Sequence, residues 1–214
     1  MADLSKYQTK RDEGLETDSK TVVGAINELY NELTNKPKGL RVLQYKSNIS
    51  GNFPTFNDGF EYEYEEKING DGTYEMIVYA KDILPTSISF KDNANLLSLS
   101  YANTTNVTDM KFMFYGCKAL TSLDLSSFDT TNVTDMYGMF NGCNSITDLE
   151  PPQNLKLSHD ISSMTLLPAQ EIVQWLNALP TVTDSPTITI GTTLSSKLTA
   201  EEIAIATNKG WVVS

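Results

Sequence analysis

Few side chains in this sequence could act as a nucleophile or as a general base. The chain has two cysteines, Cys117 and Cys143, and one histidine, His159. Covalent catalysis needs a nucleophile beside a base, and a zinc site needs closely spaced Cys and His ligands; the sequence offers neither spacing. His159 stands in the polar run 157–160, which predicts a solvated loop residue. We therefore expect no enzyme, no catalytic residue, no metal and no cofactor, and we expect the two cysteines to be buried, reduced thiols.

Acidic residues leave one catalytic alternative open. The chain has 27 Asp and Glu residues, and a pair of them could cleave a glycosidic bond, although no pair is singled out by its spacing. Against 16 Lys and Arg residues they give a formal net charge of -11. Nucleic acids and anionic lipid surfaces are bound by clustered basic residues, so both are excluded as expected partners.

The chain shows no signal for export or for membrane insertion. Residues 1–10 are polar and lack the apolar run of a signal peptide, and no run of about 18 apolar residues occurs. The sequence therefore predicts a protein that is made in a cytoplasm and is not inserted into a membrane.

The most specific pattern is an internal repeat. Residues 104–110, Thr-Thr-Asn-Val-Thr-Asp-Met, recur as residues 130–136, and the match extends to 113–117 against 139–143. In a weaker earlier copy, 97–99 stands 26 residues before 123–125. A period of 26 is typical of leucine-rich repeats, whose units bury their apolar edges by stacking on one another. The residues expected to line this core are Val107, Met110, Met113, Phe114, Cys117, Leu120, Leu123, Leu125 and Phe128.

A short helix is expected before the repeat region. The helical pattern of 21–33 stops at a break that contains Pro37 and Gly39. Its apolar residues are spaced like a coiled-coil seam, but two heptads are marginal alone, so the helix either packs on its own domain or associates with copies of itself. The seam residues, which we expect to mediate oligomerisation, are Val22, Ile26, Leu29 and Leu33.

Strands and helices are expected on both sides of the repeat. Alternating residues 60–64 and 74–79, joined by the turn 69–72, predict a β-hairpin. The turn lacks the spaced carboxylates of a calcium loop. After the repeat, the pattern predicts helices over 168–178 and 199–208, the second with a Thr-x-x-Glu capping box, and strands over 187–191 and 209–213.

Residues 123–143, Leu-Asp-Leu-Ser-Ser-Phe-Asp-Thr-Thr-Asn-Val-Thr-Asp-Met-Tyr-Gly-Met-Phe-Asn-Gly-Cys, resemble the BspA-like bacterial leucine-rich repeats. The resemblance covers about residues 88–150 and continues in degenerate form to 214. Members of that family are mostly surface-exposed adhesion or recognition modules. The resemblance therefore implies a binding module.

A second resemblance concerns residues 15–29, which are similar to a short helical element of phage fibre, collar and baseplate proteins. Residues 203–212 also resemble the terminal unit of leucine-rich-repeat proteins encoded in phage genomes. In fibre proteins the helical element belongs to an oligomeric part that attaches an appendage to the particle. The resemblance implies the same for residues 1–38.

These observations predict an α+β protein. We expect a short leucine-rich-repeat-like solenoid (91–214, with a helix-strand C-terminal cap) behind a β-hairpin N-terminal cap (39–90) and an oligomerising helix (1–38). The expected function is that of a bacteriophage head or tail fibre subunit, a homotrimer or dimer located in the virion, which binds a host surface protein or glycan and other virion proteins. The alternatives are a BspA-like bacterial surface adhesin and a polysaccharide-degrading spike. The polar side chains of the repeat either satisfy backbone groups at the corners of the stack or form a polar column that binds a glycan or a protein. The residues of this possible binding surface are Thr104, Asn106, Thr108, Thr130, Asn132 and Thr134.

Overall fold

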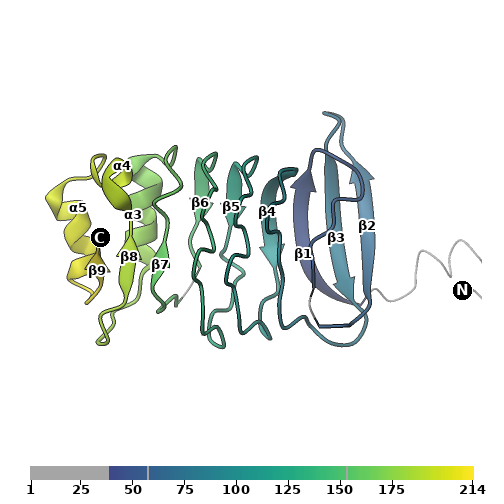
Figure 1. The fold of residues 1–214 in the computed structure, drawn as a ribbon, viewed down its shortest axis with the longest axis horizontal. Helices are drawn as coiled ribbons and strands as arrows, with labels where there is room; N and C mark the ends of the chain where they lie inside the picture. The colour runs from purple at the N-terminus through teal and green to yellow at the C-terminus, as the bar shows by residue number, and fades with distance from the viewer. Residues whose placement is uncertain (1–38, 57, 153) are drawn as a thin grey trace, which may run out of the picture. The chain divides into compact units, whose positions relative to one another are not determined.

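Strands that run side by side along most of the chain form one sheet. The computed structural model describes residues 39–56, 58–152 and 154–214. Antiparallel pairing joins β1 (Leu40–Ser47), β2 (Tyr62–Ile68), β3 (Tyr74–Ala80) and β4 (Leu96–Ala102), and parallel pairing adds β5 (Ser122–Asp124) and β6 (Asp148–Glu150). The order in the sheet is β2-β3-β1-β4-β5-β6 (Figure 1). The sheet therefore changes from antiparallel to parallel at β4, where the repeat begins.

The expected hairpin is confirmed, although its first strand begins two residues later than the pattern predicted. β2 and β3 pair from Tyr62 opposite Ala80 to Ile68 opposite Tyr74. In the connecting turn, the Asn69 N–H donates to the carbonyl of Thr73 at 2.8 Å. Gly72 takes a φ of +81°, which glycine adopts without steric cost. Glycine at position 72 therefore allows the tight turn that the sequence predicted over residues 69–72.

The two strong copies of the repeat stack on one another in register. Leu123 of β5 lies opposite Leu149 of β6, 26 residues further on. The same offset brings the ring of Phe114 parallel to that of Phe140, with centroids 6.2 Å apart and an interplanar angle of 2°. All nine residues expected to line the core are buried. Stacking therefore buries the apolar edge of each copy, as the repeat pattern predicted.

The frame of the weaker first copy was predicted wrongly. Leu123 pairs with Leu99, 24 residues earlier, and not with Leu97. Leucines alternate with serines in this segment, so a slip of two residues keeps the same side chains on the same face of the strand. Sequence similarity alone therefore could not separate the two registers. The pairing places Leu99 in the buried core and leaves Leu97 partly exposed.

A second, smaller sheet and three helices end the chain. Strands β7 (His159–Asp160), β8 (Thr187–Thr189) and β9 (Val212–Val213) pair in parallel, in that order. The expected helices are α3 (Ala169–Ala178) and α5 (Ala200–Thr207), whereas α4 (Gly191–Ser195) was not predicted. α5 begins with the expected capping box of Thr199 and Glu202. The predicted elements after residue 168 are thus present, with one short helix added.

The described chain is a mixed α and β structure, mostly sheet with few helices. None of its described helices is both long and apolar enough to cross a bilayer. The predicted helix over 21–33, with the seam of Val22, Ile26, Leu29 and Leu33, lies outside the described residues.

Candidate functional site

The polar columns of the repeat are only partly at the surface. Thr104 is fully buried and Thr130 is 8% exposed, so the prediction that these two threonines form a binding surface is wrong. The reason is local hydrogen bonding. The hydroxyl of Thr104 donates to the Asp129 carbonyl at 3.0 Å and accepts the Asp129 N–H at 2.8 Å. Thr104 therefore joins one copy to the next.

The other four residues of the columns are exposed: Asn106, Thr108, Asn132 and Thr134. Two of them also bridge the copies, because Asn132 donates its amide to the Thr105 carbonyl at 3.0 Å and Thr134 donates its hydroxyl to the Thr108 carbonyl at 3.1 Å. These bonds satisfy backbone carbonyls at the corners of the stack. Two of the four exposed side chains thus already form hydrogen bonds between copies of the repeat. A role of this surface in binding remains a prediction.

His159 is a buried residue of β7, and the prediction of a solvated loop residue is wrong. Its Nδ1–H donates to the Leu157 carbonyl at 2.8 Å, and its Nε2 accepts the indole N–H of Trp175 at 3.0 Å. The imidazole also packs edge to face against Trp175 and Trp211. Burial lowers the pKa of His159 to about 4. Both nitrogens serve a neutral ring in the core, which leaves neither open to a substrate.

Both cysteines are free and buried, as expected. The thiol of Cys117 donates to the Phe90 carbonyl at 3.1 Å, and that of Cys143 donates to the Phe114 carbonyl at 3.0 Å. Burial raises the pKa of Cys117 to about 12 and also raises the pKa of Cys143. A thiol with so high a pKa is not a nucleophile near neutral pH. The cysteines therefore act as core residues.

A polar groove opens on the outer face of the sheet, where β1, β4 and the β2–β3 turn meet. Its volume is about 450 Å³. The sequence analysis missed it, because its residues come from four separate segments. One signal was present: Gln44 and Lys46 alternate with buried Leu43 and Tyr45 along β1. The polar residues that line the groove are Gln44, Lys46, Asn69, Asp71, Glu75, Ser98 and Ser100.

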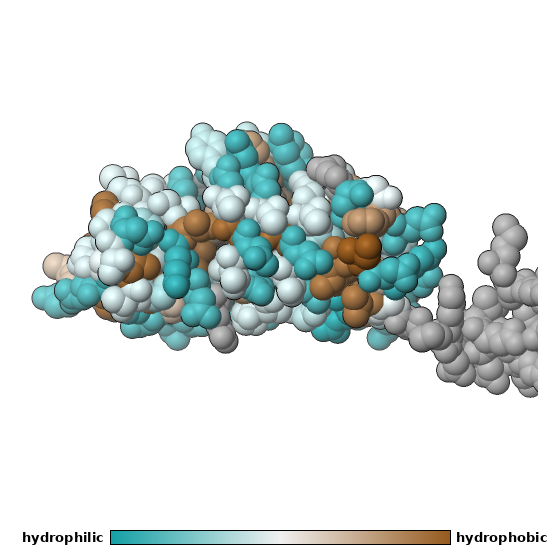
Figure 2. Space-filling model, turned by 90° about the horizontal axis from the view of Figure 1, so that it is seen from below, coloured by the Kyte–Doolittle hydropathy of each residue, from teal (hydrophilic) through white to brown (hydrophobic). Residues whose placement is uncertain are grey.

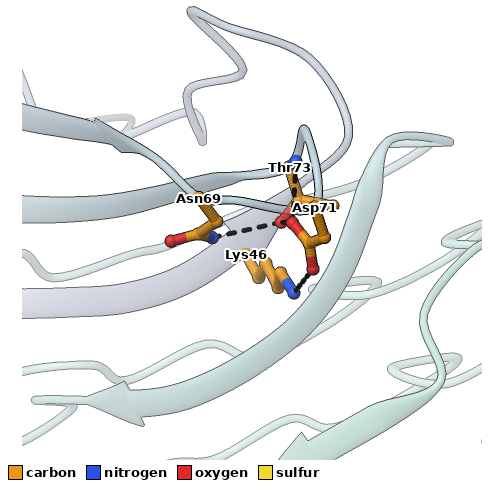
Figure 3. A network of polar contacts seen from close by, with 4 residues as sticks. All are labelled: Lys46, Asn69, Asp71 and Thr73. Atoms are coloured by element: carbon orange, nitrogen blue, oxygen red, sulfur yellow. Dashed lines mark hydrogen bonds and ion pairs between the residues drawn. The ribbon is translucent and has the colours of Figure 1, made fainter.

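Hydrogen bonds order one wall of this groove (Figure 3). The Lys46 ammonium from β1 lies 2.8 Å from a carboxylate oxygen of Asp71 in the turn. The other carboxylate oxygen accepts the Thr73 N–H at 3.0 Å, and Asn69 donates its amide to the Thr73 hydroxyl at 3.1 Å. The Lys46 hydrogen bond, followed by those from Thr73, holds the pKa of Asp71 well below its ordinary value. Asp71 therefore keeps its negative charge near neutral pH.

The groove can offer a ligand both donors and acceptors. A lysine ammonium has three N–H groups, and Asp71 takes one of those of Lys46. On the floor, Gln44 donates to Glu75, and the Ser98 and Ser100 side chains stand beside them. Within the part of the chain that is described, no three His, Cys, Asp or Glu residues are grouped to hold a metal ion. The chemistry that this groove supports best is recognition of a hydroxyl-rich molecule.

A hydrophobic patch interrupts the mainly polar face seen in Figure 2, at the end of the molecule that contains β1, β2 and β3. Large apolar residues from this part of the chain are exposed, among them Leu40 and Phe60. β2 is also one of the two edge strands of the sheet. Contiguous exposed apolar surface often marks a contact with a partner. This end is therefore a second candidate surface.

Comparison with known proteins agrees with part of the predicted resemblance. Residues 82–173 match the family described as "Mycoplasma protein of unknown function, DUF285". This match is compatible with a BspA-like repeat, and it covers the strands from β4 to β7 and the first half of α3. No curated protein and no solved structure matches the chain. The family match does not reach residues 1–38 and names no activity.

Proposed function

We propose that the chain is a non-catalytic subunit of a bacteriophage head or tail fibre, which displays residues 39–214 to bind a host glycan. The observation that carries the binding role is the groove over β1 and β4, where amide, hydroxyl, carboxylate and ammonium groups surround about 450 Å³. Sugar hydroxyls both donate and accept hydrogen bonds, so a ligand rich in hydroxyl groups suits this mixture. Regular strands hold most of these side chains, which limits the entropy lost on binding.

The solenoid, with a cap at each end, belongs to the same proposal. The stacked copies support a solenoid, since Leu99, Leu123 and Leu149 follow one another across three parallel strands. Strand β1, with the hairpin β2–β3 beyond it, then covers one end of the stack, and α3, with α5 packed on it, covers the other. Terminal units of this kind shield the apolar ends of a repeat array from water.

Attachment to the particle is assigned to residues 1–38, as a homotrimer or homodimer. Support comes from the likeness of residues 15–29 to the helical element of phage fibre proteins and from the seam of Val22, Ile26, Leu29 and Leu33. Several copies on one appendage would raise avidity without requiring a tight single site. The alternative is a bacterial surface adhesin or interaction protein, and the match of residues 82–173 to a Mycoplasma family favours it.

The groove can be tested with the double variant Gln44→Ala and Ser98→Ala. Both side chains line the groove and both come from regular strands, so the fold should be retained. Each lost hydrogen bond contributes about 0.5–1.5 kcal/mol, and we expect binding to purified host envelope polysaccharide to weaken about tenfold. Isothermal titration calorimetry measures the affinity.

The matched control is Lys81→Ala. It removes an exposed ion pair with Glu61 on the same sheet but outside the groove, and it should bind like the unmodified chain. Equal affinity of the groove variant and the unmodified chain would show that the groove is not the binding site.

A further inference from the structure

A row of aromatic and basic side chains, exposed except for the half-buried Phe112, lies on the turns of successive copies of the repeat. We call it the aromatic–lysine row; its members are Lys91, Lys111, Phe112, Tyr115 and Tyr137. Tyr115 is 38% exposed and Tyr137 is 66% exposed. The ring of Phe112 lies between them, with centroids 5.5 Å from each and edge-to-face geometry. Three aromatic rings therefore form one surface that is not part of the core.

The two lysines of the row are held against these rings. The Lys91 ammonium lies 5.5 Å from the ring centroid of Phe112 and 5.6 Å from that of Tyr115. The Lys111 ammonium lies 5.4 Å from the centroid of Phe112 and 5.5 Å from that of Tyr137. These distances are within the range of cation–π attraction. The ammonium groups thus stay on the aromatic surface.

Neither ammonium forms an ion pair with a carboxylate in the described part of the chain. Three acidic residues stand beside the row in the sequence: Asp92, next to Lys91, and Asp109 and Asp135, which hold the turns. Asp109 accepts the backbone N–H of Lys111, and Asp135 accepts that of Tyr137, each at 2.7 Å. On a chain with a formal charge of -11, these two ammonium groups have no ion-pair partner among the described residues and can meet the carboxylates of a ligand.

Backbone strain at Phe112 gives an independent reason to assign a function to the row. Phe112 has a φ of +56°, a left-handed conformation that side chains other than that of glycine rarely adopt. The equivalent position 26 residues later is Gly138, with a φ of +63°. A Cβ on Gly138 would lie 2.6 Å from the Phe112 ring. Phe112 therefore keeps a strained backbone conformation, and the absence of a side chain on Gly138 leaves space for its ring. Backbone strain of this kind is found at binding sites.

We propose that the aromatic–lysine row binds a polysaccharide chain that carries carboxylates, such as a polymer of uronic acids. The rings would pack on the apolar C–H faces of the sugars, and the ammonium groups would pair with the carboxylates. The row crosses three successive copies, which stack at the strand spacing of about 4.8 Å, so an extended chain can contact several of them. This assignment goes beyond the proposed function, because it adds a second site outside the groove and gives the ligand a charge.

The first test is ligand selectivity. The full chain is titrated calorimetrically with oligomers of polygalacturonate, alginate and hyaluronate. Poly-L-glutamate serves as a polyanion without sugar rings, and dextran serves as an uncharged sugar polymer. We expect binding to at least one uronate polymer and at least about tenfold weaker binding to both controls. Failure of all three uronates to bind, or equal binding of poly-L-glutamate, would overturn the proposal.

The second test uses Phe112→Gly and Tyr137→Ala. Both variants should bind the uronate about tenfold more weakly. Phe112→Gly should unfold at the same temperature as the unmodified chain or higher, because glycine suits the left-handed backbone. If Phe112 has only a structural role, Phe112→Gly should instead unfold at a lower temperature. In that case Tyr137→Ala should still bind the uronate like the unmodified chain.

Two matched controls locate the ligand. Tyr101→Ala removes a ring that stacks under Arg41 on β4, away from the row, and should leave uronate binding unchanged. The groove variant Gln44→Ala and Ser98→Ala should weaken uronate binding less than the row variants do. Uronate binding that is lost in the groove variant and kept in the row variants would place the ligand in the groove and refute this inference.

Discussion

Replacing Phe140 by alanine is expected to lower the free energy of unfolding by about 3–5 kcal/mol. Phe140 is fully buried and stacks on Phe114, whose ring in turn stacks on Phe90 with centroids 5.8 Å apart. On its other side it meets Trp175 of α3, at 6.3 Å and nearly perpendicular. The substitution would therefore open a cavity at the junction between the repeat and the C-terminal helices, where the rigid sheet cannot collapse to fill it.

Urea denaturation followed by circular dichroism measures this change. Met113→Ala, at another fully buried position, should cost about 2–5 kcal/mol. Tyr137→Ala is the matched control, because it removes a neighbouring aromatic ring that is 66% exposed, and it should change stability by about 0.5 kcal/mol or less. An unchanged urea midpoint in Phe140→Ala would show that the 26-residue spacing of the repeat does not direct these side chains into a core.

Mild acid is expected to destabilise the protein by about 3 kcal/mol between about pH 6.5 and pH 4, through His159. Burial lowers the pKa of His159 from the ordinary value of 6.5 to about 4. In this window the unfolded chain binds a proton that the folded chain excludes, so stability falls as the pH falls. Trp175 and Leu157 explain the preference for the neutral ring, because their hydrogen bonds use Nε2 as an acceptor and Nδ1–H as a donor.

The measurement is the urea midpoint at pH 7.0, 5.5 and 4.5. His159→Gln keeps a side chain able to donate and accept hydrogen bonds but cannot titrate, so its midpoint should change much less over the same range. Acidic groups with lowered pKa values, such as Asp71 and Asp129, lose their contribution at lower pH and fall outside this window. A pH dependence that is the same in both proteins would mean that His159 is not the group responsible.

Much of the core could be predicted from the sequence, because the residues that form it are marked by a local motif or by the 26-residue period. Identical residues 26 apart can share an environment only if the copies stack, so the burial of Met113 and Phe140 followed from the repeat. The capping box of Thr199 and Glu202 followed from short-range chemistry in the same way. The frame of the first copy did not, because Leu97 and Leu99 fit the pattern equally well and only the pairing of β4 with β5 separates them.

Features that depend on distant segments could not be predicted. His159 has polar neighbours in sequence, and its burial follows from Trp175 and Trp211, which lie on other elements. The groove joins Gln44 to Asp71 and Ser98, and no local pattern connects these residues. The sequence could not decide whether the Thr104 side chain faces a ligand or bonds to backbone groups, and its hydroxyl bonds to the Asp129 backbone of the next copy. In each case a tertiary contact decides the role of the residue.

We propose that residues 1–38 build the chain into a phage particle and that residues 39–214 are displayed from it. The most direct measurement is cryo-electron microscopy of purified particles of a phage whose genome encodes this sequence, labelled with an antibody fragment raised against residues 39–214. We expect label on a head or tail appendage. We also expect no label on particles assembled with Ile26→Asp and Leu29→Asp, which should leave the chain monomeric with its repeat folded. Purified particles that contain no copy of the unmodified chain would contradict the claim and favour the bacterial surface protein.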